Sequence, residues 1–159
     1  MHRKGSLVLA FVTIAIVAAI VYLAVGWNVS ALPEPGGVET AVSMRARDWY
    51  IRRGAATVSA KPPPKDASAV SAGEGSYEMA CAFCHGKGAS GPTNVGRAMY
   101  PRAADLSARD VQQMSDRELF WVVKNGLRLT GMPGFGNILS DDQIWQVTYY
   151  VRTLRKPPS

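Results

Sequence analysis

The chain has 159 residues, among them 18 Lys and Arg, 12 Asp and Glu, two His and two Cys, and its formal net charge is +6. Residues 1–27 and residues 28–66 each carry +2, and the remainder also carries +2, from ten basic and eight acidic residues. Because the basic excess is not concentrated in the part long enough to form a globular core, the composition argues against a nucleic-acid-binding protein.

The N-terminal segment is uncharged and almost wholly apolar from Leu7 through Trp27, a run of 21 residues. As a helix this run is long enough to span the roughly 30 Å hydrocarbon core of a bilayer. Arg3 and Lys4 precede it, so the positive-inside tendency places the remainder on the periplasmic or extracellular side of the cytoplasmic membrane. We therefore expect residues 1–28 to be a single-pass anchor.

A cleaved signal peptide is the alternative, because Val29-Ser30-Ala31 offers the small residues that a signal peptidase accepts. The apolar run is longer than the usual signal core of about 7 to 15 residues, which favours the anchor. Both interpretations export the rest of the chain.

Residues 29–69 read as a linker that contains one helix. Pro-rich stretches at Leu32–Gly37 and Lys61–Lys65 favour extended backbone, and Val38–Arg53 predicts a helix between them. The Arg45–Arg53 part mixes basic and aromatic groups, so it could lie on anionic lipid head groups, dock on a neighbouring subunit, or be a solvated linker helix. A fully flexible leash of this length would reach about 35 Å.

Residues 70–156 are left for one small core, and their patterns are helical. Ser71-x-x-Glu74, Ser115-x-x-Glu118 and Ser140-x-x-Gln143 predict three helix starts, and Asn125-Gly126 predicts the end of the second helix. The third helix has an apolar face at Ile144, Val147, Val151 and Leu154 and is stopped by Pro157-Pro158. No segment alternates like a strand, so the predicted fold class is all-α.

Cys81-Ala82-Phe83-Cys84-His85 has the spacing C-x-x-C-H, which is the attachment sequence of a covalently bound c-type haem. The two thiols add to the haem vinyl groups, and His85 becomes the proximal iron ligand. A zinc site lacks further donors, because His2 is the one other histidine, and a thioredoxin-like pair lacks its strand and helix context. No internal repeat is found, so we expect one haem c per chain.

Methionine is the expected sixth ligand, since a second histidine is excluded by the position of His2 beyond the apolar segment. Met132 lies in the Gly- and Pro-punctuated loop Leu129–Phe135, where the backbone can bring a side chain onto a metal. Met99 remains an alternative ligand. Met114, beside a predicted helix cap, is expected to fill the core.

These features together resemble the class I cytochromes c over about residues 70 to 155. Gly73-x-x-x-Tyr77-x-x-x-Cys81-x-x-Cys84-His85 is similar to the family's N-terminal helix and haem motif, and Gly131-Met132-Pro133 to its distal methionine loop. Leu139–Leu154 is similar to its C-terminal helix. Val95–Pro101 and Glu118–Pro133 resemble the membrane-tethered bacterial monohaem cytochromes.

The resemblance implies further roles for particular residues. Gly73 and Tyr77 would lie where the first and last helices cross, next to Tyr150. Pro92 would accept a hydrogen bond from His85 through its carbonyl, with a plain turn proline as the alternative.

Haem propionates call for charge-assisted donors at the edge of the pocket. Tyr100, Arg102 and Trp121 take this role by the same resemblance, and for each of them a solvated or core position is the alternative.

The resulting functional hypothesis is a one-electron carrier, not an enzyme by itself, in a membrane-associated respiratory or photosynthetic chain. Its partners would be a membrane redox complex, such as a quinol-oxidising complex, a terminal oxidase or a photosynthetic reaction centre, together with membrane lipid. Both a fixed subunit of a larger oxidoreductase and a tethered shuttle are consistent with this hypothesis. The alternative is a haem-based gas sensor or a peroxidase-like enzyme with a labile sixth ligand.

Overall fold

The computed structural model describes residues 2–26, 30–88 and 90–156, in two compact units that divide at residue 30. The first unit is one helix, α1 (His2–Gly26), whose side chains from Gly5 to Ala24 are exposed and which is long and apolar enough to cross a membrane. It is the one such helix in the described part of the chain. A signal sequence would share this length and composition, and the predicted positions Trp27 and Val29 lie outside the described residues.

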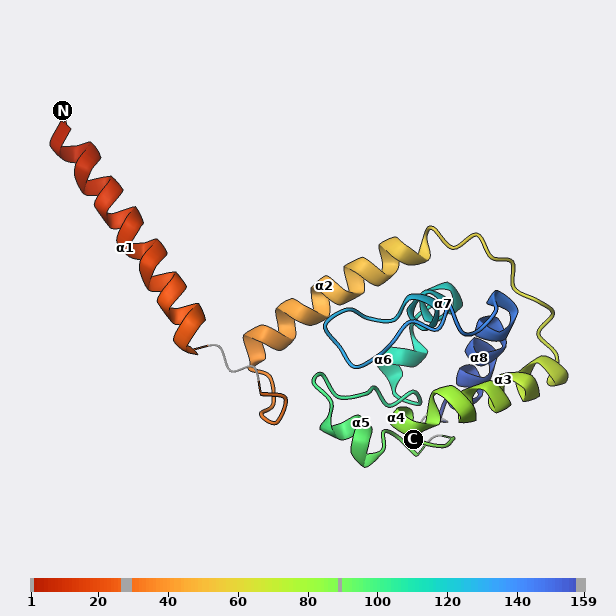
Figure 1. The fold of residues 1–159 in the computed structure, drawn as a ribbon. Helices are drawn as coiled ribbons and strands as arrows, with labels where there is room; N and C mark the ends of the chain where they lie inside the picture. Colours follow the sequence, from red (N-terminus) through yellow and green to blue (C-terminus); the bar gives the residue numbers. More distant parts are fainter. Residues whose placement is uncertain (1, 27–29, 89, 157–159) are drawn as a thin grey trace. The chain divides into compact units, whose positions relative to one another are not determined.

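The second unit is built from helices and connecting loops (Figure 1), and its described residues contain no strand, which confirms the all-α fold class. Its helices are α2 (Gly37–Ala55), α3 (Ala67–Ala80), α4 (Ala82–His85), α5 (Asn94–Ala98), α6 (Arg109–Gln112), α7 (Asp116–Asn125) and α8 (Asp141–Thr153).

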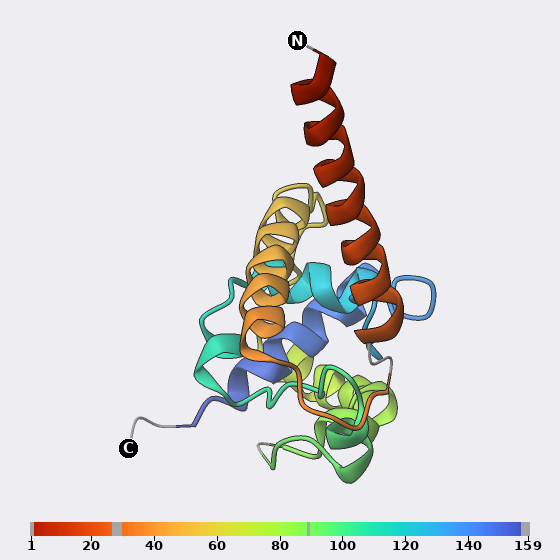
Figure 2. The same cartoon turned by 90° about the vertical axis from the view of Figure 1, so that its left-hand side faces the viewer.

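The centre of this unit is the crossing of α3 and α8, which lie against each other (Figures 1 and 2). At Gly73 the two backbones approach so closely that a β-carbon would lie 1.9 Å from the carbonyl oxygen of Gln146. Tyr77, fully buried one turn further on, packs against Tyr150 with ring centroids 5.0 Å apart. The predicted crossing of the first and last cytochrome-like helices is therefore confirmed.

Helices α7 and α8 begin as the sequence predicts. Ser115 and Ser140 each cap a helix by accepting from the main-chain N–H three residues on, and Glu118 and Gln143 complete the two capping boxes. These pairs satisfy N–H groups that the first turn of a helix leaves unpaired. The predicted apolar face of α8 is buried. Pro157-Pro158 lie outside the described residues.

The N-cap of α3 lies five residues before the predicted Ser71 cap, so that prediction is wrong. Asp66 is the N-cap residue, and its carboxylate accepts from the Ala69 N–H at 2.8 Å. An aspartate in extended conformation before an Ala-rich segment is as good a cap as serine, and the helix then buries Ala69.

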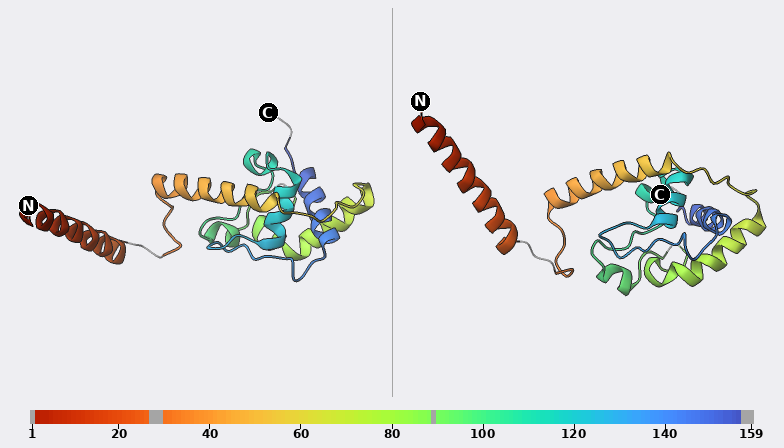
Figure 3. Two further views of the ribbon diagram at one scale, coloured as in Figure 1. Left: turned by 90° about the horizontal axis from the view of Figure 1, so that it is seen from above. Right: turned by 45° about the horizontal axis from the view of Figure 1, so that its top comes forward.

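The segment predicted as a linker contributes a packed helix. Near the C-terminal end of α2, Ile51 and Ala55 are buried, and a β-carbon at Gly54 would lie 2.2 Å from the Trp121 ring of α7. The two helices meet there (Figure 3), so α2 belongs to the same compact unit as α3 to α8. Apolar burial on α7 therefore fixes this helix, in place of the fully flexible leash considered for a segment of this length.

Candidate functional site

The C-x-x-C-H segment sits at the junction of α3 and α4. Cys81 is both the C-cap residue of α3 and the N-cap residue of α4. Its carbonyl accepts from the N–H groups of Cys84 and His85 at 3.1 and 3.0 Å. One tight turn thus holds all three predicted haem-attachment residues. Both thiols are free and partly buried.

The imidazole of His85 is fixed by a main-chain carbonyl. Its Nδ1 lies 2.9 Å from the carbonyl oxygen of Ala104. A carbonyl can only accept, so this contact keeps the proton on Nδ1 and leaves the lone pair of Nε2 for a metal. The donor set of two free thiols and one oriented histidine therefore fits a covalently attached c-type haem.

The hydrogen bond expected between Pro92 and His85 is not formed. The Pro92 carbonyl accepts from Nη1 of Arg97, and Ala104 takes the place that the resemblance assigned to Pro92. The Ala103 N–H donates to the carbonyl of Gly96 at 2.9 Å, which anchors this stretch on α5 and brings the Ala104 carbonyl to the histidine. Sequence reasoning missed Ala104, because a main-chain acceptor has no side-chain signature.

Helix α5 packs against α4. Thr93 caps α5, and its hydroxyl donates to the Phe83 carbonyl at 2.7 Å. A β-carbon at Gly96 would lie 2.1 Å from the carbonyl oxygen of Cys84. Thr93 and Gly96 are thus positioning residues, and Thr93 could have been recognised as the cap of a short helix.

Tyr77 connects the helix crossing to the residue after the histidine. Its hydroxyl donates to the Gly86 carbonyl at 2.7 Å, and burial raises the pKa of Tyr77 well above its usual value. Gly86 has φ +81°, where a β-carbon would lie 2.1 Å from the Gly91 carbonyl oxygen. A neutral, permanent donor therefore fixes the main chain that leaves α4.

Burial also raises the pKa of the Cys81 thiol to about 11, with a smaller contribution from neighbouring Cys84. At neutral pH the thiol is protonated. A thioredoxin-like pair needs a lowered thiol pKa, so the electrostatics of Cys81 disfavour that alternative.

The loop that carries Met132 folds back on α7. The Met132 carbonyl accepts from the Leu127 N–H at 3.2 Å, and its own N–H donates to the Thr130 hydroxyl at 3.0 Å. Beyond it, the Phe135 N–H donates to the carbonyl of Val123 at 3.0 Å. Met132 is partly buried within this closed turn.

The alternative ligand Met99 touches the same loop. A β-carbon at Gly131 would lie 2.9 Å from Sδ of Met99. The structure thus brings the two candidate methionines to adjoining positions, with Met99 packed on the backbone beside Met132. Met114 packs against the buried cluster around Tyr77 and Val147, which confirms its core role.

The three predicted propionate-binding residues have other partners in the structure. The Tyr100 hydroxyl donates to Glu39, and Nη2 of Arg102 lies 2.5 Å from Oε1 of Glu34. The Trp121 ring lies against α2, with its centroid 5.7 Å from that of Tyr50. The contacts of Trp121 are those of a packing residue, and its role in binding haem stays a prediction.

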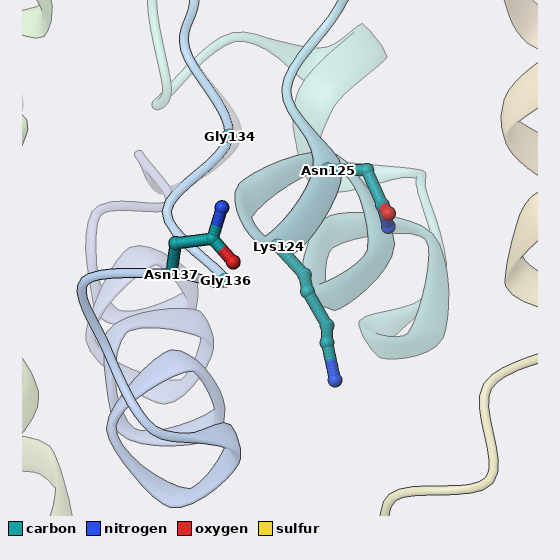
Figure 4. A pocket seen from close by; sticks show the side chains of 5 residues that line it. All are labelled: Lys124, Asn125, Gly134, Gly136 and Asn137. Atoms are coloured by element: carbon teal, nitrogen blue, oxygen red, sulfur yellow. The ribbon is translucent and has the colours of Figure 1, made fainter.

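A hollow at the C-terminal end of α7 lies outside this constellation (Figure 4). Its lining residues are Lys124, Asn125, Gly134, Gly136 and Asn137. None of them is a predicted haem ligand, and Lys124 is already paired with Asp141 at 2.5 Å.

Residues 68–151 match the family model described as cytochrome C oxidase, cbb3-type, subunit III, a stretch that runs from α3 to α8 and includes the attachment motif and Met132. The chain belongs to this family. As a cytochrome c domain it binds haem and serves haem-based electron transfer. No curated protein sequence matches the chain.

Solved structures include chains that are similar to this one. A chain of the reducing HAO-like protein complex of Kuenenia stuttgartiensis aligns with a TM-score of 0.52 and 24% identity over 60% of this chain and 48% of its own length. This chain thus spans about half of that relative. Cytochrome cL from the marine methylotroph Methylophaga aminisulfidivorans aligns with a TM-score of 0.46 and 22% identity, over 80% of this cytochrome and 72% of its own chain.

Proposed function

We propose that this cytochrome is a membrane-anchored one-electron carrier with one haem, attached through Cys81 and Cys84 and ligated by His85 and Met132. The observation that carries the proposal is the contact between His85 Nδ1 and the Ala104 carbonyl, because it orients the imidazole and frees Nε2 for iron. When bound, the haem iron accepts and releases one electron.

The chain's own residues keep the site rigid during this exchange. Thr93 and Gly96 hold α4, Tyr77 holds the main chain after His85, and the Ala104 carbonyl holds the imidazole. An electron carrier should rearrange little between oxidation states. These contacts serve that need, because they fix the main chain of the segment that bears the histidine. None of them requires a proton to move.

Met132 is favoured over Met99 by the contacts of the two residues. The Sδ of Met99 packs against the backbone at Gly131 and so supports the loop. Met132 itself belongs to the turn of that loop, where its N–H donates to the Thr130 hydroxyl. Thioether ligation favours ferrous iron and raises the potential.

Helix α1 would hold the protein in the cytoplasmic membrane, with the haem domain on the periplasmic or extracellular side. The family description names a cbb3-type oxidase subunit, so a terminal oxidase is the best-supported redox partner among the membrane complexes considered. A cytochrome of this kind passes electrons within, or to, such a complex.

The ligand assignment is tested with Met132→Ala and, as the matched control, Met99→Ala. We expect the near-infrared sulfur-to-iron band of the oxidised protein to disappear only in Met132→Ala, with a lower midpoint potential and new carbon monoxide binding to the reduced form. Rapid carbon monoxide binding by the wild type would instead support the gas-sensor or peroxidase-like alternative.

Covalent attachment is tested separately with Cys81→Ser/Cys84→Ser. The double variant should lose the haem stain after denaturing electrophoresis. A stain of wild-type intensity would contradict the proposed attachment.

A further inference from the structure

Helix α2 has two different faces. Ile51 and Ala55 turn toward α7, whereas Val38, Val42, Arg45, Trp49 and Arg53 recur every three or four residues on the other side. All five are exposed, and Trp49 keeps 59% of its surface accessible. With the neighbouring Arg52, also exposed, they form what we call the outer face of α2.

The charge on the outer face is of one sign. Arg45, Arg52 and Arg53 provide three positive charges, and Arg53 lies over the Trp49 ring at 5.6 Å. The two acids of α2 are engaged elsewhere, since Asp48 pairs with Arg47 at 2.7 Å and Glu39 accepts from Tyr100. No acidic side chain therefore neutralises the three arginines from the helix itself.

Helix α2 is fastened to the cytochrome body at both ends. Its C-terminal end packs on Trp121, and its N-terminal end is tied by the contacts of Glu39 with Tyr100 and of Glu34 with Arg102. Whatever binds the outer face thus also orients the body, because the helix and the body form one compact unit.

The position of α2 in the chain limits what it can meet. Ten residues separate α1 from α2, and at full extension they reach at most about 35 Å. If α1 spans the bilayer, as the proposed function holds, the start of α2 stays within this distance of the lipid surface, and Arg53 lies at most about 24 Å further along the helix. Arginine with tryptophan is also the composition that settles at the head-group layer of a bilayer.

We infer that the outer face of α2 binds the anionic lipid surface of the membrane that holds α1, and so fixes the orientation of the haem domain. Each basic residue near an anionic surface strengthens such binding about fivefold, so the three arginines together contribute up to about 100-fold at low salt. The inference rests on the proposed membrane anchor and makes the protein an oriented carrier instead of a free-swinging one.

The test uses the full-length holoprotein in vesicles of phosphatidylcholine, with or without phosphatidylglycerol. In the holoprotein the native cysteines hold haem, so Val42→Cys introduces a single reactive thiol for a nitroxide label on the outer face. In the anionic vesicles we expect this label to gain oxygen accessibility and to lose accessibility to a water-soluble nickel complex.

Arg45→Gln/Arg52→Gln/Arg53→Gln should reverse that change, as should high salt. The control Lys61→Gln/Arg109→Gln/Arg155→Gln removes the same charge from exposed positions outside α2 and should leave the label at residue 42 in the lipid interface. A label at Ile138→Cys should stay in water throughout.

A label at Val42→Cys that stays fully accessible to nickel in both vesicles overturns the inference. So does protection that appears in native membranes but not in anionic vesicles, since it would indicate a protein partner. A label at Ile14→Cys reports independently on α1, and its failure to enter the bilayer would contradict the anchor and not the lipid affinity of α2.

Discussion

Gly73 offers the sharpest test of the α3 and α8 crossing. A β-carbon at this position would lie 1.9 Å from the Gln146 carbonyl oxygen, about 1.5 Å short of an ordinary contact of 3.4 Å. The obstacle is backbone, so Gly73→Ala has to push the two helices apart. Separation by this amount weakens the neighbouring contacts of Tyr77 with α8.

Gly75 supplies the matched control on the same helix. It is exposed, and a β-carbon there would meet nothing within 4 Å. Gly75→Ala should therefore raise the free energy of unfolding by about 0.5–1 kcal/mol through helix propensity alone. Gly73→Ala has the same gain, but overpacking against backbone costs about 3 kcal/mol, so its net effect is a loss of about 2 kcal/mol.

The two free energies are measured by guanidinium unfolding of the detergent-solubilised holoprotein, followed by haem absorbance and far-ultraviolet circular dichroism. The midpoint should fall for Gly73→Ala and rise for Gly75→Ala, with similar slopes. Equal midpoints for the two variants would refute the close crossing.

Three further predictions concern contacts elsewhere in the compact unit. Arg152→Ala should lower the free energy of unfolding by about 2–3 kcal/mol, because its guanidinium bonds Asp116 at 2.7 Å and two main-chain carbonyls before α7. Arg152→Lys should not restore the lost stability, since an ammonium cannot reproduce this set of bonds. Denaturant unfolding of both variants checks the prediction. Bonds to the Ser68 hydroxyl and the Ala69 N–H lower the pKa of Asp66 below 3.8, so Asp66→Ala should cost stability at neutral pH, and melting curves of the two proteins should converge as the pH falls through that lowered pKa. Gly54→Ala should loosen α2 from Trp121 and speed limited proteolysis around residues 56–66 while the haem spectrum stays unchanged; equal cleavage rates would contradict the α2 contact.

Local signals in the sequence predicted much of this fold. The capping boxes at Ser115 and Ser140 depend on residues three positions apart, so they can be read without the rest of the chain. The same rule misplaced the start of α3, since Ser71-x-x-Glu74 fits it, whereas the actual N-cap residue, Asp66, is followed three residues later by Ala69 and has no capping-box pattern. Local rules therefore predicted these helices but placed the start of α3 incorrectly.

Contacts between distant segments could not be predicted in this way. The packing of α2 on Trp121 depends on how α7 is placed by α8, and no residue of the Pro-rich flanks indicates it. The Ala104 carbonyl beside His85 is supplied by main chain, which any residue would provide. The candidate site was thus predictable where side-chain chemistry defines it and not where backbone does.

The two contacts of Tyr77 connect the helix crossing to the main chain beside the predicted iron ligand. One rigid ring packs on Tyr150 and, through its hydroxyl, holds the carbonyl directly after the histidine segment. A substitution on the far side of α8 that shifts this ring would therefore displace the main chain beside the predicted iron ligand. Variants that alter the midpoint potential should accordingly be sought along the helix crossing as well as among the residues predicted to touch haem.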